Sequence, residues 1–223
     1  MTGSLVLSRQ ALGYGDKVVL ADVTFSLAPG ERVVLLGRSG AGKSTLLNAV
    51  YRSIEREGRA IALVPQDHAL VPQLSVHHNV YMGRLDRHGA LYNLANLAWP
   101  WRVERDAVGA VLDLVGLAAE ARRPVEALSG GQKQRTALAR ALFRGGDVLI
   151  ADEPVTAVDP VQAARLMGVV RQRFATSVMA LHDVDLALAH ATRIVGIAQG
   201  RFVIDAPVAD VSRRAIDDLY RAR

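Results

Sequence analysis

A glycine-rich segment between an apolar run and an amphipathic run constrains the fold of this chain more than any other feature. The run Arg32–Leu36 is apolar after its first residue and short enough for a buried strand. It is followed by Gly37-Arg38-Ser39-Gly40-Ala41-Gly42-Lys43-Ser44-Thr45, which matches the pattern G-x-x-x-x-G-K-[ST]. Lys43–Ser53 then carries apolar residues at helical spacing. This order of strand, loop and helix predicts an α/β fold with a phosphate-binding loop.

Each residue type in this loop has its own task in phosphate binding. The glycines let the backbone curl until successive N–H groups face one anion, and the following helix directs its positive end to the same place. Lys43 can then reach the β- and γ-phosphates of a nucleotide, and the Ser44 hydroxyl can ligate Mg²⁺. Residues 37–45 therefore predict nucleotide binding. The pattern by itself leaves kinase, GTPase, helicase and transporter open.

Short runs of branched residues alternate with helical patterns along the 223 residues. The expected strands are Val18–Leu20, Val23–Leu27, Arg32–Leu36, Ala60–Val64, Val148–Ala151, Val178–Leu181, Ile194–Ala198 and Phe202–Ile204. The expected helices are Lys43–Ser53, Val103–Val115, Gly131–Phe143 and Val161–Phe174. Such alternation predicts one α/β domain with a mainly parallel core sheet. The stretch from Val18 to Leu36, turning at residues 28–30, predicts antiparallel strands at one edge.

The middle of the chain differs from its flanks because residues 74–142 contain no convincing strand. We predict an inserted helical subdomain at about residues 74–143, within a core of about residues 1–73 and 144–223. Both tryptophans lie in the apolar stretch Leu91–Trp101. We expect this stretch to be subdomain core rather than contact surface.

Composition and charge exclude several classes of protein. The chain has no cysteine, which excludes a disulfide scaffold, a thiolate zinc site and a cysteine nucleophile. No apolar run approaches the roughly 18 residues of a membrane span, and Met1–Leu5 lacks the features of a signal peptide, so we expect a soluble or peripheral protein. The net charge of +5 suits nucleic acid or an anionic membrane surface, but a solvated basic surface is the simpler interpretation.

A second apolar run ends in two carboxylates. Val148–Ala151 predicts a buried strand, and Asp152 and Glu153 follow it directly. The carboxyl ends of parallel strands are where an open α/β sheet binds its ligand. Asp152 fits the carboxylate that positions Mg²⁺ beside a phosphate loop, and Glu153 fits a general base that polarises the attacking water. A water-activating glutamate favours hydrolysis over phosphoryl transfer to a second substrate.

A third segment predicts another anion site. Leu128-Ser129-Gly130-Gly131-Gln132 precedes a helical pattern, and Ser-Gly-Gly at a helix start offers bare N–H groups, a hydroxyl donor and a favourable dipole. One chain has no need of two γ-phosphate sites unless a second copy supplies one of them. With this segment the sequence resembles the ATP-binding cassette (ABC) family, whose signature is Leu-Ser-Gly-Gly-Gln. The resemblance implies a P-loop NTPase fold with a RecA-like core and head-to-tail pairing of two copies.

Further residues match the family's motifs in the family's order, and the resemblance implies a role for each. Tyr14 matches the aromatic residue that stacks on adenine, and Gln66 matches the glutamine that contacts Mg²⁺ and couples to the membrane partner. Asp159 matches the loop that communicates across the dimer, and His182 matches the histidine that senses the γ-phosphate. On this basis Lys43, Gln66, Glu153 and His182 would be catalytic, with ATP and Mg²⁺ as cofactors. Residues 37–45 and 129–132 would contact the nucleotide, and Ser44, Gln66 and Asp152 the metal.

Five segments look like the phosphonate-import branch of that family: Leu70–Val76, Asn79–Leu85, Leu181–Leu188, Arg193–Gly196 and Gly200–Val203. This resemblance implies an ATPase at the cytoplasmic face of the membrane, working as a homodimer with a permease and, indirectly, a solute-binding protein outside the cytoplasm, without nucleic acid. The alternatives are an ABC ATPase for another solute or for export, and a non-transport member acting on ribosomes or DNA. A general P-loop kinase is disfavoured by Leu128–Gln132 and by Glu153. The 23 positions from Lys43 to Gln66 are fewer than is usual in the family, which leaves residues 55–59 as a short turn.

Overall fold

The computed structural model describes residues 5–15 and 17–221, which form two compact units. The first unit contains the described residues up to Ile61, then Gly146–Glu153, and the chain from Phe174 onward. The second contains Ala62–Gly145 and Pro154–Arg173. The division of the chain at residues 73/74 and 143/144 stays a prediction.

The first unit is built on a mainly parallel sheet. Its strands are β5 (Val148–Asp152), β6 (Thr176–Ala180), β3 (Arg32–Leu36), β7 (Arg193–Ala198) and β8 (Arg201–Pro207), neighbours in that order. The pairs β5–β6, β6–β3 and β3–β7 are parallel, and β8 returns antiparallel to β7. All five residues of β5 and of β6 are buried, as expected of strands covered on both faces. The predicted fold class is confirmed.

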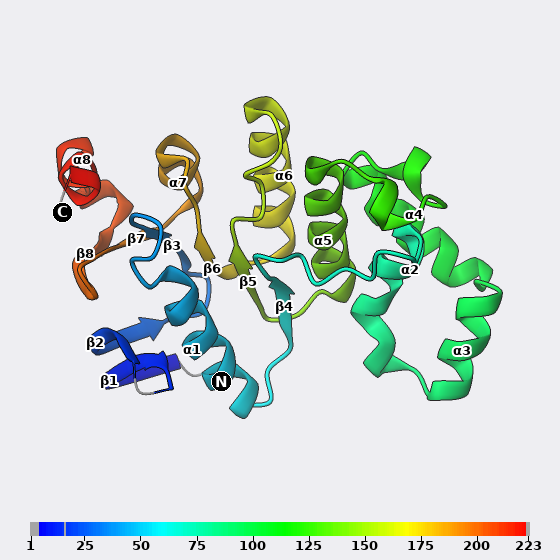
Figure 1. The fold of residues 1–223 in the computed structure, drawn as a ribbon, viewed down its shortest axis with the longest axis horizontal. Coiled ribbons are helices and arrows are strands. Elements are labelled where there is room, and N and C mark those ends of the chain that lie inside the picture. The colour runs from blue at the N-terminus through cyan, green and yellow to red at the C-terminus, as the bar shows by residue number, and fades with distance from the viewer. Residues whose placement is uncertain (1–4, 16, 222–223) are drawn as a thin grey trace. The chain divides into compact units, whose positions relative to one another are not determined.

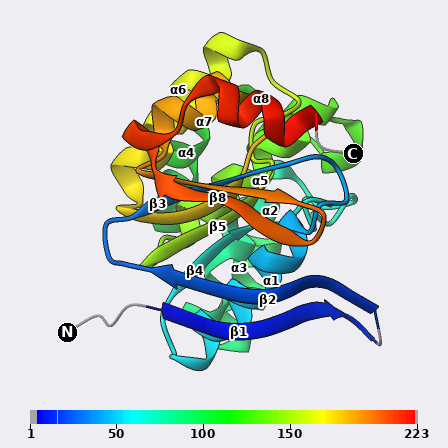
Figure 2. The same cartoon turned by 90° about the vertical axis from the view of Figure 1, so that its left-hand side faces the viewer.

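Two layers cover this sheet. On one side lie α1 (Lys43–Arg56) and an antiparallel ribbon of β1 (Leu5–Tyr14) and β2 (Lys17–Leu27). On the other side lie α7 (Val184–His190) and α8 (Arg213–Arg221), as Figures 1 and 2 show. A short 3₁₀ turn, Val208–Asp210, leads into α8.

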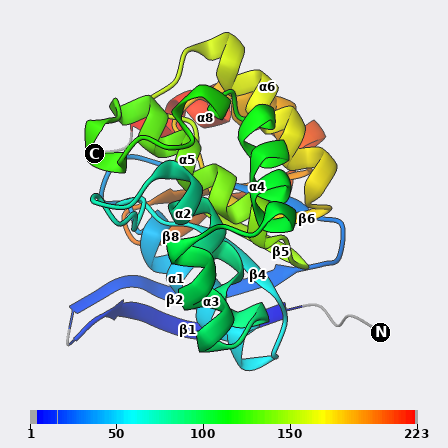
Figure 3. The same cartoon turned by 90° about the vertical axis from the view of Figure 1, so that its right-hand side faces the viewer.

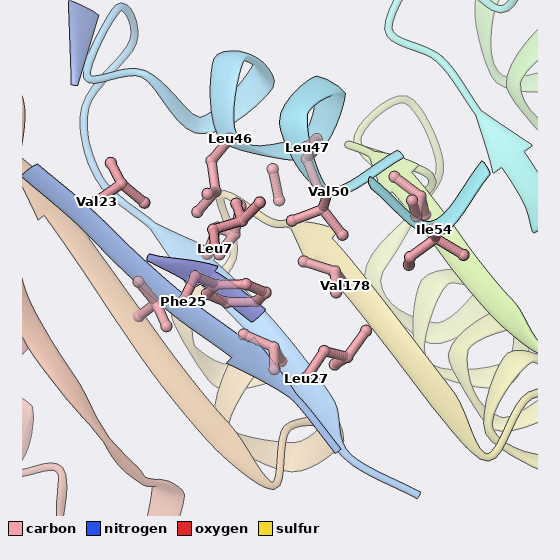
Figure 4. Packing of buried hydrophobic residues seen from close by; sticks show 14 of the residues in the cluster. Leu7, Val23, Phe25, Leu27, Leu46, Leu47, Val50, Ile54 and Val178 are labelled. Carbon is pink, nitrogen blue, oxygen red and sulfur yellow. The ribbon is translucent and has the colours of Figure 1, made fainter. Parts of the chain in front are cut away.

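The core of the first unit lies between α1, the ribbon and the sheet. Leu46, Val50 and Ile54 repeat every four residues and so share one face of α1, where all three are fully buried. This face packs on Phe25 of β2 and Val178 of β6 (Figure 4). The apolar periodicity of the sequence after Lys43 therefore fixes the helix that begins at the phosphate loop.

The predicted antiparallel strands are confirmed, but their expected pairing within residues 18–36 is wrong. β2 pairs with β1, a strand that the sequence analysis did not predict, and β3 pairs in parallel with β6 and β7. The reason is burial: β3 is apolar on both faces and needs cover on both, whereas β2 alternates buried and exposed residues and suits a ribbon with one wet face. The predicted short turn after α1 is confirmed, because Gly58 at φ 69° leads within three residues into β4 (Ile61–Val64).

The second unit is helical. Its helices are α2 (Val76–Tyr81), α3 (Ala90–Ala98), α4 (Arg102–Leu114), α5 (Gly130–Arg144) and α6 (Pro160–Arg173). Short 3₁₀ turns occupy Met82–Arg87, Ala118–Glu120 and Val125–Ala127. α2, α4 and α5 pack on one another, and α3 lies at the edge of this cluster (Figure 3). Among the described residues, no helix combines the length and the apolar character needed to cross a membrane.

The expectation that Leu91–Trp101 is subdomain core is wrong. Leu91 is 84% exposed, Leu94 66% and Trp99 79%, and only Asn96 of α3 is buried. Asn96 accepts a hydrogen bond from the Trp101 backbone N–H (2.8 Å), so a polar residue anchors the stretch. The apolar residues of this stretch instead form a surface of the second unit.

Candidate functional site

The predicted phosphate loop joins β3 to α1 and depends on two glycines with left-handed backbones. Gly37 has φ 149°, and a Cβ there would lie 2.4 Å from the Ile197 carbonyl oxygen. Gly42 has φ 109°, and a Cβ there would lie 2.7 Å from the Leu20 side chain. No side chain caps the N-terminus of α1, so its first backbone N–H groups face the loop. The loop therefore has the form of an anion cradle at a helix start.

Lys43 lies inside this loop. Its ammonium donates hydrogen bonds to the carbonyl oxygens of Gly37 (2.8 Å) and Arg38 (3.2 Å), and its residue is 6% exposed. Burial lowers the pKa of Lys43, while the carboxylates of Glu153 and Asp152 act in the opposite direction. A phosphate group bound in this loop would lie next to the Lys43 ammonium.

Ser44 and Asp152 come together from positions 108 residues apart. The Ser44 hydroxyl, in the first turn of α1, donates to Asp152 Oδ2 at the end of β5 (2.5 Å). A hydroxyl and a carboxylate are the hard oxygen ligands that Mg²⁺ prefers, and both lie next to the phosphate cradle. The residues present fit a magnesium ion held together with nucleotide phosphates.

Glu153 and His182 form a second pair. His182 Nε2 lies 2.5 Å from Glu153 Oε1, and the two residues directly follow β5 and the end of the β6 strand region. Glu153 has φ 54°, a left-handed backbone that costs a non-glycine residue of order 1 kcal/mol. Its N–H donates to the Ala180 carbonyl oxygen (3.1 Å), which fixes that backbone. The strained backbone directs a carboxylate to a histidine at the same edge of the sheet.

Tyr14 borders a groove of about 270 Å³ between β1 and α1. Its ring is exposed, and its hydroxyl accepts a weak hydrogen bond from the Asn48 amide (3.4 Å). Asn48 and Arg52 line the groove beside Tyr14 and were missed by the sequence analysis. Their helical spacing from Ser44 was the available signal, because positions i, i+4 and i+8 share one helix face.

The predicted signature segment lies in the second unit at the start of α5. Ser129 and Gln132 form a capping box: Gln132 N donates to Ser129 Oγ (3.3 Å), and Ser129 N donates to Gln132 Oε1 (3.0 Å). A Cβ on Gly131 would lie 2.5 Å from the Ala157 carbonyl oxygen, so only glycine permits this contact. The structure thus brings residues 129–132 against the loop that contains Asp159.

Two further residues of this unit carry structural roles. Asp159 Oδ1 accepts from Gln162 N (2.9 Å) and caps the first turn of α6. Gln134, which the sequence analysis missed, is buried and accepts from Ala157 N (2.6 Å), so it ties α5 to the same loop.

Gln66 is exposed and follows β4 at its carboxyl end. The turn after it has left-handed backbones at His68 (φ 62°) and Ala69 (φ 45°). The Arg140 guanidinium of α5 donates to both of their carbonyl oxygens. The turn that carries Gln66 is therefore clamped to the helix of the signature segment.

Comparisons with known proteins agree with this geometry. The family model described as ABC transporter matches residues 20–156. A "phosphonates import ATP-binding protein PhnC" of Frankia casuarinae is 39% identical over 236 residues, covering 94% of this chain and 92% of that protein. A protein of the same name from Rhizobium etli is 36% identical, covering 93% and 82%.

A solved structure, described as the dimeric structure of a bacterial ABC transporter cassette, has the same fold. It superimposes with a TM-score of 0.78 at 23% identity, covering 92% of this chain and 99% of that one. The family model spans more than half of the chain, and both curated relatives align over most of it. This chain belongs to the ABC transporter family.

Proposed function

We propose that this chain is the ATP-hydrolysing subunit of an importer that takes up phosphonate or a related oxyanion through a separate permease. The observation that carries the ATPase part is the meeting of the phosphate loop with two pairs, Ser44–Asp152 and Glu153–His182. The import part is supported by the relatives, several of which are named as phosphonate import proteins.

Each residue of the first unit has a task in this proposal. The backbone of residues 37–45 and the Lys43 ammonium hold the β- and γ-phosphates, and the Tyr14 ring stacks on the adenine. Ser44 and Asp152 would hold Mg²⁺, which supplies charge neutralisation on the phosphate oxygens, and the assignment of Gln66 to the same ion stays a prediction. Glu153 accepts a proton from the attacking water, and His182 orients the Glu153 carboxylate and contacts the γ-phosphate.

The second unit supplies the remaining contacts in trans. The N–H groups at the start of α5 and the Ser129 hydroxyl form an anion site without a phosphate loop of its own. We propose that residues 129–132 of one copy close over the ATP held by another, with Asp159 beside this junction, in a head-to-tail homodimer. Closure and reopening of the dimer would move the permease through the clamped turn that carries Gln66. The protein would act at the cytoplasmic face of the membrane, with a solute-binding protein on the far side.

Two measurements test the proposal. The Glu153→Gln variant with ATP and Mg²⁺ is expected to run as a dimer in size-exclusion chromatography, and Ser129→Arg in the same background as a monomer. A Glu153→Gln protein that stays monomeric with ATP and Mg²⁺, or a Ser129→Arg protein that still dimerises, would refute the head-to-tail dimer.

Affinity capture of the tagged chain from native membranes tests the partner. An integral membrane permease recovered at near-equal stoichiometry is expected. Ribosomal or DNA-repair proteins in place of a permease would refute transport and leave the ATPase site intact.

A further inference from the structure

A cavity of about 300 Å³ lies in the second unit and contains none of the residues assigned to ATP or Mg²⁺. It is lined by the start of α2, the loop between α3 and α4, and the segment before the signature. The side chains that matter here are Ser75, His77, His78, Trp99, Arg105 and Arg122. A cavity of this volume suits a small ligand rather than a single water molecule.

Backbone hydrogen bonds hold the walls of the cavity in place. Val76 N donates to the Arg123 carbonyl oxygen (3.0 Å), and His77 N donates to that of Ala121 (2.9 Å). The Ser75 hydroxyl lies 2.8 Å from His78 Nδ1, and the His77 and His78 rings meet edge to face at 5.4 Å. The backbone hydrogen bonds therefore fix the wall formed by residues 75–78, and the exposed side chains of Trp99, Arg105 and Arg122 complete the lining.

The charge of the lining selects for an anion. Arg105 and Arg122 both line the cavity, and within the described part of the chain neither guanidinium has an ion-pair or hydrogen-bond partner. No carboxylate lines the cavity. Glu104, a carboxylate that acts electrostatically on His77, accepts from the Tyr92 hydroxyl (3.2 Å) and lies 3.3 Å from His88 Nε2. Two exposed, unpaired guanidinium groups outweigh the single charge of Glu104 and give this site a positive potential.

His77 adds an unsatisfied polar atom to this wall. The residue is 8% exposed, and its Nε2 is buried without a hydrogen-bond partner in the described residues. Burial, reinforced by His78 and Arg105, lowers the pKa of His77 to about 4, while Glu104 opposes the shift, so the ring is neutral near pH 7. An unpaired buried polar group costs about 1–3 kcal/mol. Because this nitrogen has no exposed surface, the neutral His77 ring forms part of the wall and adds no charge to it.

The remaining wall is apolar. Trp99 is 79% exposed although it borders the cavity, and Pro100 follows it. An exposed indole beside two guanidinium groups suits a flat or apolar group that carries an acid. We propose that this cavity binds a small organic anion with one acidic group, held by Arg105 and Arg122, and an apolar part that packs on Trp99.

The tryptophans make binding directly measurable. Trp99 and Trp101 are the only two in the chain, so a Trp101→Phe variant reports on Trp99 alone. Titration with phenylphosphonate near neutral pH is expected to change the Trp99 emission and to saturate. Inorganic phosphate lacks the apolar part and benzyl alcohol lacks the charge, so each is expected to bind at least about tenfold more weakly.

Two variants and two controls decide the outcome. Arg105→Gln and Arg122→Gln are each expected to weaken phenylphosphonate binding by about tenfold. Arg102→Gln is the matched control because its side chain is 87% exposed, pairs with Asp106 and does not line the cavity. Lys43→Ala is expected to leave the signal unchanged, which separates this cavity from the phosphate loop.

Three results would overturn the proposal. The first is no saturable change up to about 10 mM probe, by fluorescence or by calorimetry. The second is equal binding by the Arg105→Gln, Arg122→Gln and Arg102→Gln variants. The third is loss of the signal in Lys43→Ala.

Discussion

The exchange of Glu153 for glutamine is the sharpest test of the proposed chemistry. It replaces one carboxylate oxygen by an amide nitrogen and leaves the shape, and therefore the left-handed backbone at φ 54°, unchanged. A general base contributes about 100- to 10,000-fold to a rate. We therefore expect ATP turnover to fall within that range.

The same structure predicts that binding and stability survive the exchange. The hydrogen bonds of Lys43 go to backbone carbonyl oxygens, and that of Ser44 goes to Asp152, so neither depends on Glu153. Removing one negative charge beside Lys43 lessens repulsion of the phosphates, and ATP affinity is expected to hold or to rise. His182 is 41% exposed in its pair with Glu153, so the pair contributes at most about 1 kcal/mol to the free energy of unfolding.

Three measurements on purified protein check this: single-turnover phosphate release, binding of a fluorescent ATP analogue, and unfolding in urea. Glu57→Gln makes the same chemical change at a carboxylate that is 40% exposed and forms an ion pair with Arg59 at 3.6 Å, and it should leave all three unchanged. Turnover within about threefold of the parent protein would refute the assignment of Glu153 as the base. A parallel loss of ATP affinity would instead place Glu153 in binding.

The structure makes three further predictions. Lys43→Ala removes a buried cation that this loop holds in hydrogen bonds, and nucleotide affinity measured by fluorescence titration should fall about 10- to 100-fold. Gly42→Ala should cost about 2–4 kcal/mol of the free energy of unfolding, because a Cβ would strike Leu20 at φ 109°. Gly40→Ala, at φ 80° with no atom within 4 Å, should cost only about 1 kcal/mol, and equal costs in urea would contradict the steric argument. Because the pKa of His77 is lowered from 6.5 to about 4, the unfolded chain binds a proton first as the pH falls. Stability should therefore be complete above pH 6.5 and fall by up to about 3 kcal/mol towards pH 4, a slope that His77→Phe should flatten in urea unfolding at several pH values.

The sequence predicted correctly those helices and strands whose structure is determined by residues nearby in sequence. α1 begins at Lys43 as predicted, and α4 and α5 lie within one residue of their predicted bounds. β5 begins at Val148 as predicted and ends at Asp152, one residue after the predicted end. Each of these segments has a strong hydrophobic period and is bounded by turn residues. Tertiary contacts therefore agree with the local preference of the sequence.

Non-local contacts explain what the sequence did not predict. β1 contains polar residues, and its pairing with β2 is interrupted by irregularities in register. Its sequence therefore lacks a regular strand pattern, and its pairing with β2 makes it a strand. The α3 segment is apolar by composition, yet hydrogen bonds of Asn93 and Asn96 fix its position and leave its leucines exposed. The composition of this segment indicates that exposing its leucines is unfavourable, but it does not reveal the asparagine hydrogen bonds that hold the segment at the surface. The structural roles of Arg140 and Gln134 could not be predicted from the sequence either. Both side chains bind backbone atoms of turns that lie far away in the sequence.

The register of the sheet brings the catalytic pairs of the first unit together. Ala180 of β6 lies opposite Asp152 of β5 and opposite Leu35 of β3, so three neighbouring parallel strands end at nearly the same level. The segments that follow them supply Lys43 and Ser44 after β3, Glu153 after β5, and His182 after β6. A shift of one residue in either pairing would move a strand end by about 3.3 Å and turn its side chains to the other face, which would separate Ser44 from Asp152 or Glu153 from His182. The complete burial of β5 and β6 opposes such a shift, because every alternative register places Asp152 deeper among apolar residues or exposes them. The hydrophobic pattern that defines the strands therefore also sets the spacing of the residues proposed to act on ATP.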